Sequence, residues 1–164
     1  MNKNYILDAD TVARKITRLA YEIAERNHGE QQIILAGIWQ HGSVIAHNIA
    51  KELSGITDAK ILITDIILDK RNPTAVTLRD NFDCTNQLVI LVDDVANSGK
   101  TMLHALKPFL SLGPRTIQTL VLVERTHKQF PIQADYVGLS VSTTLEEHIF
   151  VEIENEKITG AYMA

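Results

Sequence analysis

Short apolar runs alternate with helical patterns along most of the chain, and this alternation constrains the fold more than any other feature. Apolar runs predict strands at residues 33–38, 61–68, 88–92 and 116–123. Apolar residues at helical spacing predict helices at residues 11–28, capped by Asp10 or Thr11, from residue 41 to a stop at Gly55, and at residues 101–110. Such alternation is typical of a parallel sheet with helices on both faces, and ligands bind these sheets outside the carboxyl ends of the strands.

Length and composition exclude several classes of protein. The chain has 164 residues, which predicts one domain at a prior of ~150 residues per domain. Its 16 Lys and Arg against 20 Asp and Glu give a net charge of −4, unlike a strongly basic nucleic-acid coat protein. Cys84 is the only cysteine, so no disulfide or cysteine zinc cluster can hold the fold.

No secretory signal or membrane segment is expected from the sequence. The first ten residues carry charge but no apolar stretch. The longest apolar run, residues 33–39, is far shorter than the ~20 residues that a membrane helix needs. We therefore expect a cytoplasmic protein without a membrane partner.

The most informative stretch is residues 89–101, where an apolar strand runs into two acids, a loop of small residues and a predicted helix. Ser98, Gly99 and Thr101 offer backbone amides and hydroxyls at the start of that helix, where an anion such as phosphate is favoured. Asp93 and Asp94 can accept hydrogen bonds from the neighbouring hydroxyls of a sugar. The pattern therefore predicts a sugar-phosphate site.

Two other interpretations were weighed for this stretch. Gly99-Lys100-Thr101 matches the end of a phosphate-binding P-loop, but that motif needs a glycine five positions before Gly99, where Asp94 stands. The acids could also simply end a strand and cap a helix, as Asp often does. The succession of strand, acids, small loop and helix favours a ligand site over both.

This stretch resembles the signature of the type I phosphoribosyltransferases, which bind 5-phosphoribosyl 1-diphosphate (PRPP). Ser98 stands where the family usually has Thr and keeps the hydroxyl. Residues 17–27, the glycines at 37 and 42, and residues 121–138 are similar to one subfamily, the bifunctional pyrimidine-operon attenuation regulators with uracil phosphoribosyltransferase activity. The resemblance implies a central, mostly parallel sheet flanked by helices, with a small hood from the terminal segments.

The resemblance also implies roles for individual residues. Asp93 and Asp94 would hold the ribose hydroxyls as the catalytic residues, and Mg²⁺ would be bound mainly through PRPP. The implied PRPP-binding loop continues through Ala96, Asn97, Ser98, Gly99, Lys100 and Thr101. The implied pyrophosphate loop is Trp39, Gln40, His41 and Gly42. An implied lid at residues 69–87 carries Lys70, Arg71 and Arg79. The base would lie at Tyr136, Val137 and Gly138.

One departure from the subfamily leaves two functions open. Trp39-Gln40-His41 stands where the subfamily usually has Lys-Thr-Arg, and an ordinary His is mostly neutral at pH 7. The leading prediction is phosphoribosyl transfer from PRPP to a pyrimidine-like nucleobase. The alternative is a non-catalytic regulator that senses PRPP or a nucleotide and could bind RNA.

The partners implied by the resemblance are RNA and further copies of the chain. Gln133 and Leu139 stand where the regulators usually carry cations, which disfavours RNA binding, although Arg18, Arg26 and Lys128 remain. A homodimer or a higher homo-oligomer is expected from the family alone.

Overall fold

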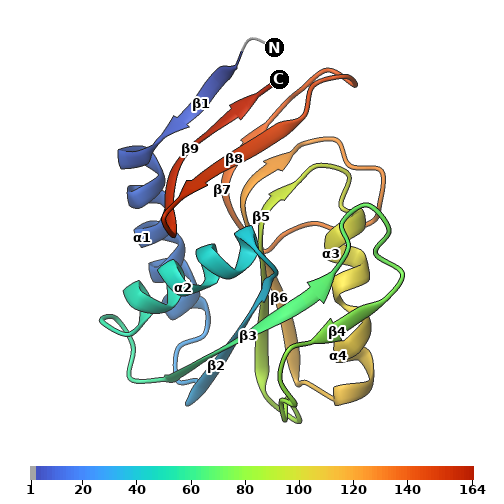
Figure 1. The fold of residues 1–164 in the computed structure, drawn as a ribbon. Coiled ribbons are helices and arrows are strands. Elements are labelled where there is room, and N and C mark those ends of the chain that lie inside the picture. Colours follow the sequence, from blue (N-terminus) through green and yellow to red (C-terminus); the bar gives the residue numbers. More distant parts are fainter. Residues whose placement is uncertain (1–2) are drawn as a thin grey trace.

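A six-stranded sheet forms the centre of the molecule in the computed structural model, which describes residues 3–164 (Figure 1). The strand order is β4-β3-β2-β5-β6-β7, and every neighbouring pair is parallel except β3 and β4. The strands are β2 (Gln32–Ile38), β3 (Lys60–Leu68), β4 (Val76–Leu78), β5 (Leu88–Ala96), β6 (Thr116–Arg125) and β7 (Tyr136–Val141). The predicted α/β fold is confirmed. The two residues before Lys3, part of the segment examined for a secretory signal, lie outside the described residues.

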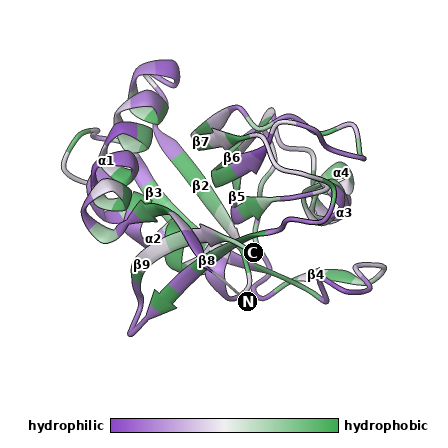
Figure 2. Ribbon diagram, turned by 90° about the horizontal axis from the view of Figure 1, so that it is seen from above, coloured by the Kyte–Doolittle hydropathy of each residue, from purple (hydrophilic) through white to green (hydrophobic). Residues whose placement is uncertain are grey.

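Helices cover both faces of this sheet (Figure 1). α1 (Ala9–Arg26) and α2 (His41–Leu53) pack on one face, and α3 (Lys100–Ala105) and α4 (Lys107–Leu112) on the other. The apolar colouring of the central strands in Figure 2 fits a sheet that is buried on both sides. Within residues 3–164, no helix has both the length and the apolar character to cross a membrane.

Two details of the helices differ from the sequence prediction. α1 begins at Ala9 and is capped by Asp8, whose Oδ1 accepts a hydrogen bond from the Thr11 amide at 2.7 Å, so neither Asp10 nor Thr11 is the cap. The single helix predicted at residues 101–110 is wrong: α3 ends at Ala105 and α4 begins at Lys107. Pro108 lies in the first turn of α4, and because proline has no N–H it cannot continue the hydrogen bonding of α3.

The two ends of the chain form a separate antiparallel sheet of β1 (Asn4–Asp8), β9 (Lys157–Met163) and β8 (Ile149–Glu154). Asn97, just after β5, holds this sheet beside the carboxyl end of β5. Its side-chain nitrogen donates to the Ile149 carbonyl at 3.3 Å, and its side-chain oxygen accepts from the Ile149 amide at 3.2 Å. The hood predicted from the terminal segments is thus present.

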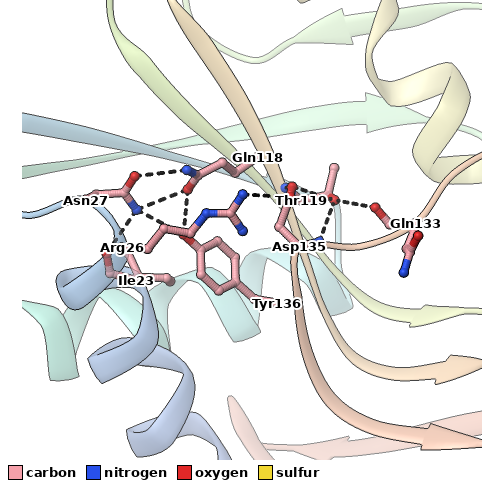
Figure 3. A network of polar contacts seen from close by, with 8 residues as sticks. All are labelled: Ile23, Arg26, Asn27, Gln118, Thr119, Gln133, Asp135 and Tyr136. Atoms are coloured by element: carbon pink, nitrogen blue, oxygen red, sulfur yellow. Dashed lines mark hydrogen bonds and ion pairs between the residues drawn. The ribbon is translucent and has the colours of Figure 1, made fainter.

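A buried polar network ties the end of α1 to β6 and β7 (Figure 3). The Tyr136 hydroxyl donates to Gln118 Oε1 at 2.6 Å, and Gln118 Nε2 donates to Asn27 Oδ1 at 2.9 Å. Asn27 Nδ2 donates to both Gln118 Oε1 and the Tyr136 hydroxyl at 3.0 Å. Since each buried polar group has a partner here, the network stabilises the contact between helix and sheet.

Replacing Tyr136 with Phe should therefore lower the free energy of unfolding by about 1 kcal/mol, the usual net value of one such hydrogen bond. Urea denaturation measures the change. The matched control is Tyr21→Phe, because Tyr21 is 57% exposed on α1. Equal stability of the two variants would show that the network contributes nothing.

Candidate active site

The floor of the site consists of two adjacent carboxylates in β5. The strand predicted at residues 88–92 is too short, because β5 stays paired with β6 as far as Ala96, opposite Glu124. β2, on the other side of β5, pairs with it only as far as Val92. Asp93 and Asp94 therefore follow the point where β2 turns away, and their side chains are 2% and 10% exposed.

The start of α2 lies directly against this point, because two glycines allow close approach. A Cβ on Gly42 would lie 2.5 Å from the Val92 carbonyl oxygen and 3.1 Å from the Cα of Asp93. A Cβ on Gly37 would lie 2.7 Å from the Cα of Ser43. These separations exclude any larger residue without backbone movement, so the loop between β2 and α2 is held at the edge of the carboxylates.

A cleft of about 600 Å³ opens over the acids, and its walls come from segments distant in sequence. Most of the predicted site residues line it. They are Trp39, Gln40, His41, Lys70, Arg71, Asp93, Asp94, Ala96, Asn97, Ser98, Gly99 and Thr101. The structure thus brings together the predicted pyrophosphate loop, the start of the predicted lid and the loop after β5.

Other predicted site residues do not line the cleft. Gly42 packs beneath it, and Lys100 is also absent from its lining. Arg79 stacks on the Trp39 ring, with 3.9 Å between the guanidinium carbon and the ring centroid, and forms an ion pair with Asp65 at 2.9 Å. Arg79 therefore supports the Trp39 loop from outside.

The residues predicted to bind the base lie in β7, away from the lining of the cleft. The Tyr136 ring is buried and its hydroxyl is used in the network of Figure 3. The Val137 and Gly138 carbonyls accept hydrogen bonds from Arg18, at 2.9 Å each, and Gly138 also accepts one from Lys15. These groups face α1.

The sequence interpretation missed the apolar wall of the cleft. The missed lining residues are Leu68, Val95, Met102, Val121, Ile149, Phe150 and Val151, and Asp69, at the start of the predicted lid, also lines the cleft. The run at residues 149–153 has the local pattern of a strand, but that pattern carries no information on which end of the sheet it covers. The pairing of Asn97 with Ile149 places β8 at the cleft.

The predicted lid is only partly open to the cleft. Lys70 and Arg71 lie in the connection between β3 and β4, whereas Phe82 and Cys84 pack into the core beside α3 and α4. Cys84 is fully buried, and burial raises the pKa of its thiol, which makes it a poor nucleophile.

The acid pair is neutralised by cations of the same chain. Lys70 Nζ lies 2.9 Å from Asp93 Oδ1 and 3.1 Å from Asp94 Oδ1, and His41 Nδ1 lies 2.8 Å from Asp94 Oδ2. Burial and the neighbouring Asp94 carboxylate raise the pKa of Asp93. Burial acts in the same direction on Asp94, but the hydrogen bond with His41 and the charge of Lys70 outweigh it and hold the pKa of Asp94 below its usual range.

His41 is more basic than its sequence context suggests. The hydrogen bond to Asp94 raises the pKa of its imidazole above the ordinary value, although partial burial acts in the opposite direction. The sequence gives no sign of this contact, because the partner carboxylate comes from a strand 53 residues away.

The three cations considered for RNA contact all have partners within the chain. Arg18 donates to the carbonyls of β7 and pairs with Glu22 at 3.6 Å. Arg26 pairs with Asp135 at 3.2 Å, and Lys128 pairs with Glu124 at 2.9 Å with only 10% of its side chain exposed. A phosphate would have to compete with these contacts.

Comparison with known proteins gives a family for this arrangement. The family model described as phosphoribosyl transferase domain matches residues 3–154. A protein of Enterococcus faecalis named bifunctional protein pyrR is 39% identical over 163 residues, covering 94% of this chain and 92% of its own. A Roseiflexus protein named bifunctional protein PyrR is 40% identical over 159 residues, covering 91% and 87%.

Solved structures agree on the fold. A hypoxanthine-guanine phosphoribosyltransferase of Bacillus anthracis superposes with a TM-score of 0.78 at 19% identity, over 97% of this chain and 96% of that chain. The hypoxanthine phosphoribosyltransferase of Trypanosoma cruzi gives 0.76 at 14% identity, over 96% and 95%. With the family match over residues 3–154 and the bifunctional PyrR relatives, these findings show that the chain belongs to the phosphoribosyltransferase family.

Proposed function

We propose that the chain transfers the phosphoribosyl group of PRPP to a pyrimidine-like nucleobase. The observation that carries this proposal is the position of Asp93 and Asp94 on the floor of one cleft. The hydroxyl-bearing loop after β5 lies to one side, the Trp39–His41 loop to the other, and an apolar wall from β8 completes the cleft. Each part of PRPP then has a chemically matching surface.

The two carboxylates would hold the ribose through its 2- and 3-hydroxyls, because carboxylate oxygens accept hydrogen bonds from neighbouring hydroxyls. The 5-phosphate would lie on the loop of Ala96–Thr101, where the Ser98 and Thr101 hydroxyls line the cleft. Gly99 has a left-handed φ of 83°, and a Cβ there would lie 2.4 Å from Ile132, so glycine is required at this turn.

The reaction would be displacement of diphosphate at the anomeric carbon by a nitrogen of the base. The bond from that carbon to the diphosphate oxygen breaks, and positive charge develops on the ribose ring. The bond to the nitrogen then forms, and the nitrogen loses its proton to the departing diphosphate or to water. The buried carboxylates lie where they would stabilise this charge. His41, Lys70 and Arg71 would face the departing diphosphate.

Mg²⁺ would enter this site together with PRPP. Within residues 3–164, no group of three or more His, Cys, Asp or Glu side chains is placed to hold a metal ion. Two adjacent carboxylates suit Mg²⁺, which is commonly held by one or two carboxylates plus the phosphates of a substrate. Asp93 and Asp94 would be the protein groups nearest to it, and its charge would offset that of the diphosphate.

The base would lie against the apolar wall of the cleft. Val121, Ile149 and Phe150 line it, and the Phe150 ring stacks on Tyr162 with 5.3 Å between centroids. Such a wall binds a planar ring and keeps water from the anomeric carbon, which protects PRPP from hydrolysis.

We place this reaction in the cytoplasm and expect self-association, which sedimentation measurements can test.

Steady-state assays with PRPP, Mg²⁺ and a panel of nucleobases test the proposal. Release of diphosphate that depends on a pyrimidine is the expected result. PRPP binding without turnover on any base would favour the alternative of a PRPP-sensing regulator. Gel-shift experiments with RNA at two salt concentrations would then determine whether RNA is its partner.

Changing both acids to amides should abolish PRPP binding. For Asp93→Asn with Asp94→Asn, we expect at least an about 100-fold loss of affinity, because two charged acceptors are lost. Isothermal titration calorimetry with Mg²⁺ measures it. The matched control is Asp58→Asn with Asp80→Asn, two exposed acids that do not line the cleft.

The same double variant should remain folded, although its acids lie in a buried strand and not in a loop. The lowered pKa of Asp94 means that its charge stabilises the fold at neutral pH, and the raised pKa of Asp93 means that its charge destabilises it. The two losses oppose each other. Thermal unfolding checks this. If the double variant does not fold, the calorimetric titration uses the single variant Asp93→Asn, which keeps the stabilising charge of Asp94.

The pairing of His41 with Asp94 should appear in its titration. We expect NMR to give an imidazole pKa above the ordinary ~6.5, falling in Asp94→Asn. Because the folded-state pKa is raised, the stabilisation from this pair is complete below the unfolded value and is lost as the pH rises through the folded value. The loss of stability in His41→Gln should therefore be larger at about pH 6 than at about pH 8. Equal losses at both values would contradict the pairing, and His28→Gln, at an exposed His after α1, is the control.

A further inference from the structure

Lys70 occupies the place on the acid pair that the proposed function gives to the ribose. Its ammonium nitrogen bridges Asp93 Oδ1 and Asp94 Oδ1, at 2.9 and 3.1 Å. His41 contacts the second oxygen of Asp94 at 2.8 Å, and the Asp94 amide donates to Asp93 Oδ1 at 2.9 Å. Donors of the chain itself therefore use both oxygens of Asp94 and one oxygen of Asp93.

A ribose diol needs the same oxygens. Its two hydroxyls donate hydrogen bonds as the ammonium group does, and the ammonium already uses one oxygen of each carboxylate in the cleft. The ribose and the Lys70 ammonium therefore compete for Asp93 Oδ1 and Asp94 Oδ1.

Lys70 is the partner that can move. Its side chain is 41% exposed, and it lies in the connection between β3 and β4, whereas the acids are buried in a strand with a paired neighbour. Its departure has a cost, because two buried carboxylates lose a cation. A neutral diol restores the hydrogen bonds but not the charge.

PRPP differs from ribose 5-phosphate at this point. Its diphosphate gives the displaced ammonium a new anionic partner in the same cleft, where Arg71 and the Trp39–His41 loop also lie. Ribose 5-phosphate offers no such partner near the anomeric carbon. The exchange of Lys70 from carboxylates to diphosphate would thus favour the activated sugar over the unactivated one.

We propose that Lys70 acts as an internal competitor for the ribose subsite and so makes the cleft selective for PRPP over ribose 5-phosphate. This inference rests on the proposed function, since it assumes that the acids bind ribose. Lys70 leaves the acid pair when the sugar enters and moves to the diphosphate. It is a specificity residue whose effects on the two ligands have opposite signs.

The test compares Lys70→Met with Arg71→Met, which removes the same charge from the same connection and the same cleft. Calorimetry gives the affinity for ribose 5-phosphate without metal and for PRPP with Mg²⁺. In Lys70→Met we expect ribose 5-phosphate to bind about tenfold more tightly and PRPP about tenfold more weakly, as for one charge-assisted hydrogen bond gained or lost. In Arg71→Met both ligands should bind more weakly, because only favourable charge is lost.

A measurement on the unmodified protein keeps the test valid if Lys70→Met does not fold. Inorganic diphosphate can bind the Lys70 ammonium in place of the diphosphate group of PRPP. Saturation with diphosphate and Mg²⁺ should therefore increase the affinity for ribose 5-phosphate. Lys70→Arg, which keeps the charge, should retain this increase.

The outcomes separate the inference from the proposed function. If the unmodified protein binds neither PRPP nor ribose 5-phosphate, the proposed function and the inference both fail. If it binds PRPP but Lys70→Met weakens both ligands as Arg71→Met does, the inference alone is overturned. Absence of any effect of diphosphate on ribose 5-phosphate binding would overturn it as well.

Discussion

The site depends on the unequal lengths over which the two neighbours of β5 pair with it. β2 pairs with β5 only as far as Val92, whereas β6 stays paired with it as far as Ala96. Asp93 and Asp94 therefore have a strand neighbour on one side only. A strand position fixes a carboxylate more firmly than a loop would, because its backbone hydrogen bonds are satisfied by the neighbouring strand. Both acids are buried because they lie within this strand. Because a buried carboxylate loses the stabilisation of water, each needs a positively charged or hydrogen-bonding partner nearby.

Much of the fold could be predicted from local pattern. Strands buried on both faces give continuous apolar runs, as at residues 33–38 and 88–92, and the amphipathic spacing of α1 is equally plain. The errors lie where a local signal competes with tertiary structure. Two acids after an apolar run suggest the end of a strand, but pairing with β6 extends β5 to Ala96. Apolar spacing alone predicts one continuous helix, which Pro108 divides into α3 and α4.

The candidate site was predictable where one short segment carries it and not where distant segments meet. Asp93–Thr101 was found because acids, small residues and hydroxyls lie within nine positions of one another. The contact of His41 with Asp94 joins residues 53 positions apart, and the pairing of Asn97 with Ile149 joins residues 52 apart. Neither has a local signature. The apolar wall that β8 contributes to the cleft has no local signature either.

The double hydrogen bond between the Asn97 side chain and the Ile149 backbone links the floor of the cleft to both ends of the chain. β8 pairs with β9, and β9 pairs with β1, so the first and last strands belong to the same small sheet as a wall of the cleft. A peptide fused to either terminus would therefore lie one or two strands from β8, which lines the cleft. A load at the chain ends would therefore reach the loop after β5 through the pairing of Asn97 with Ile149 as well as through the core contacts of the small sheet.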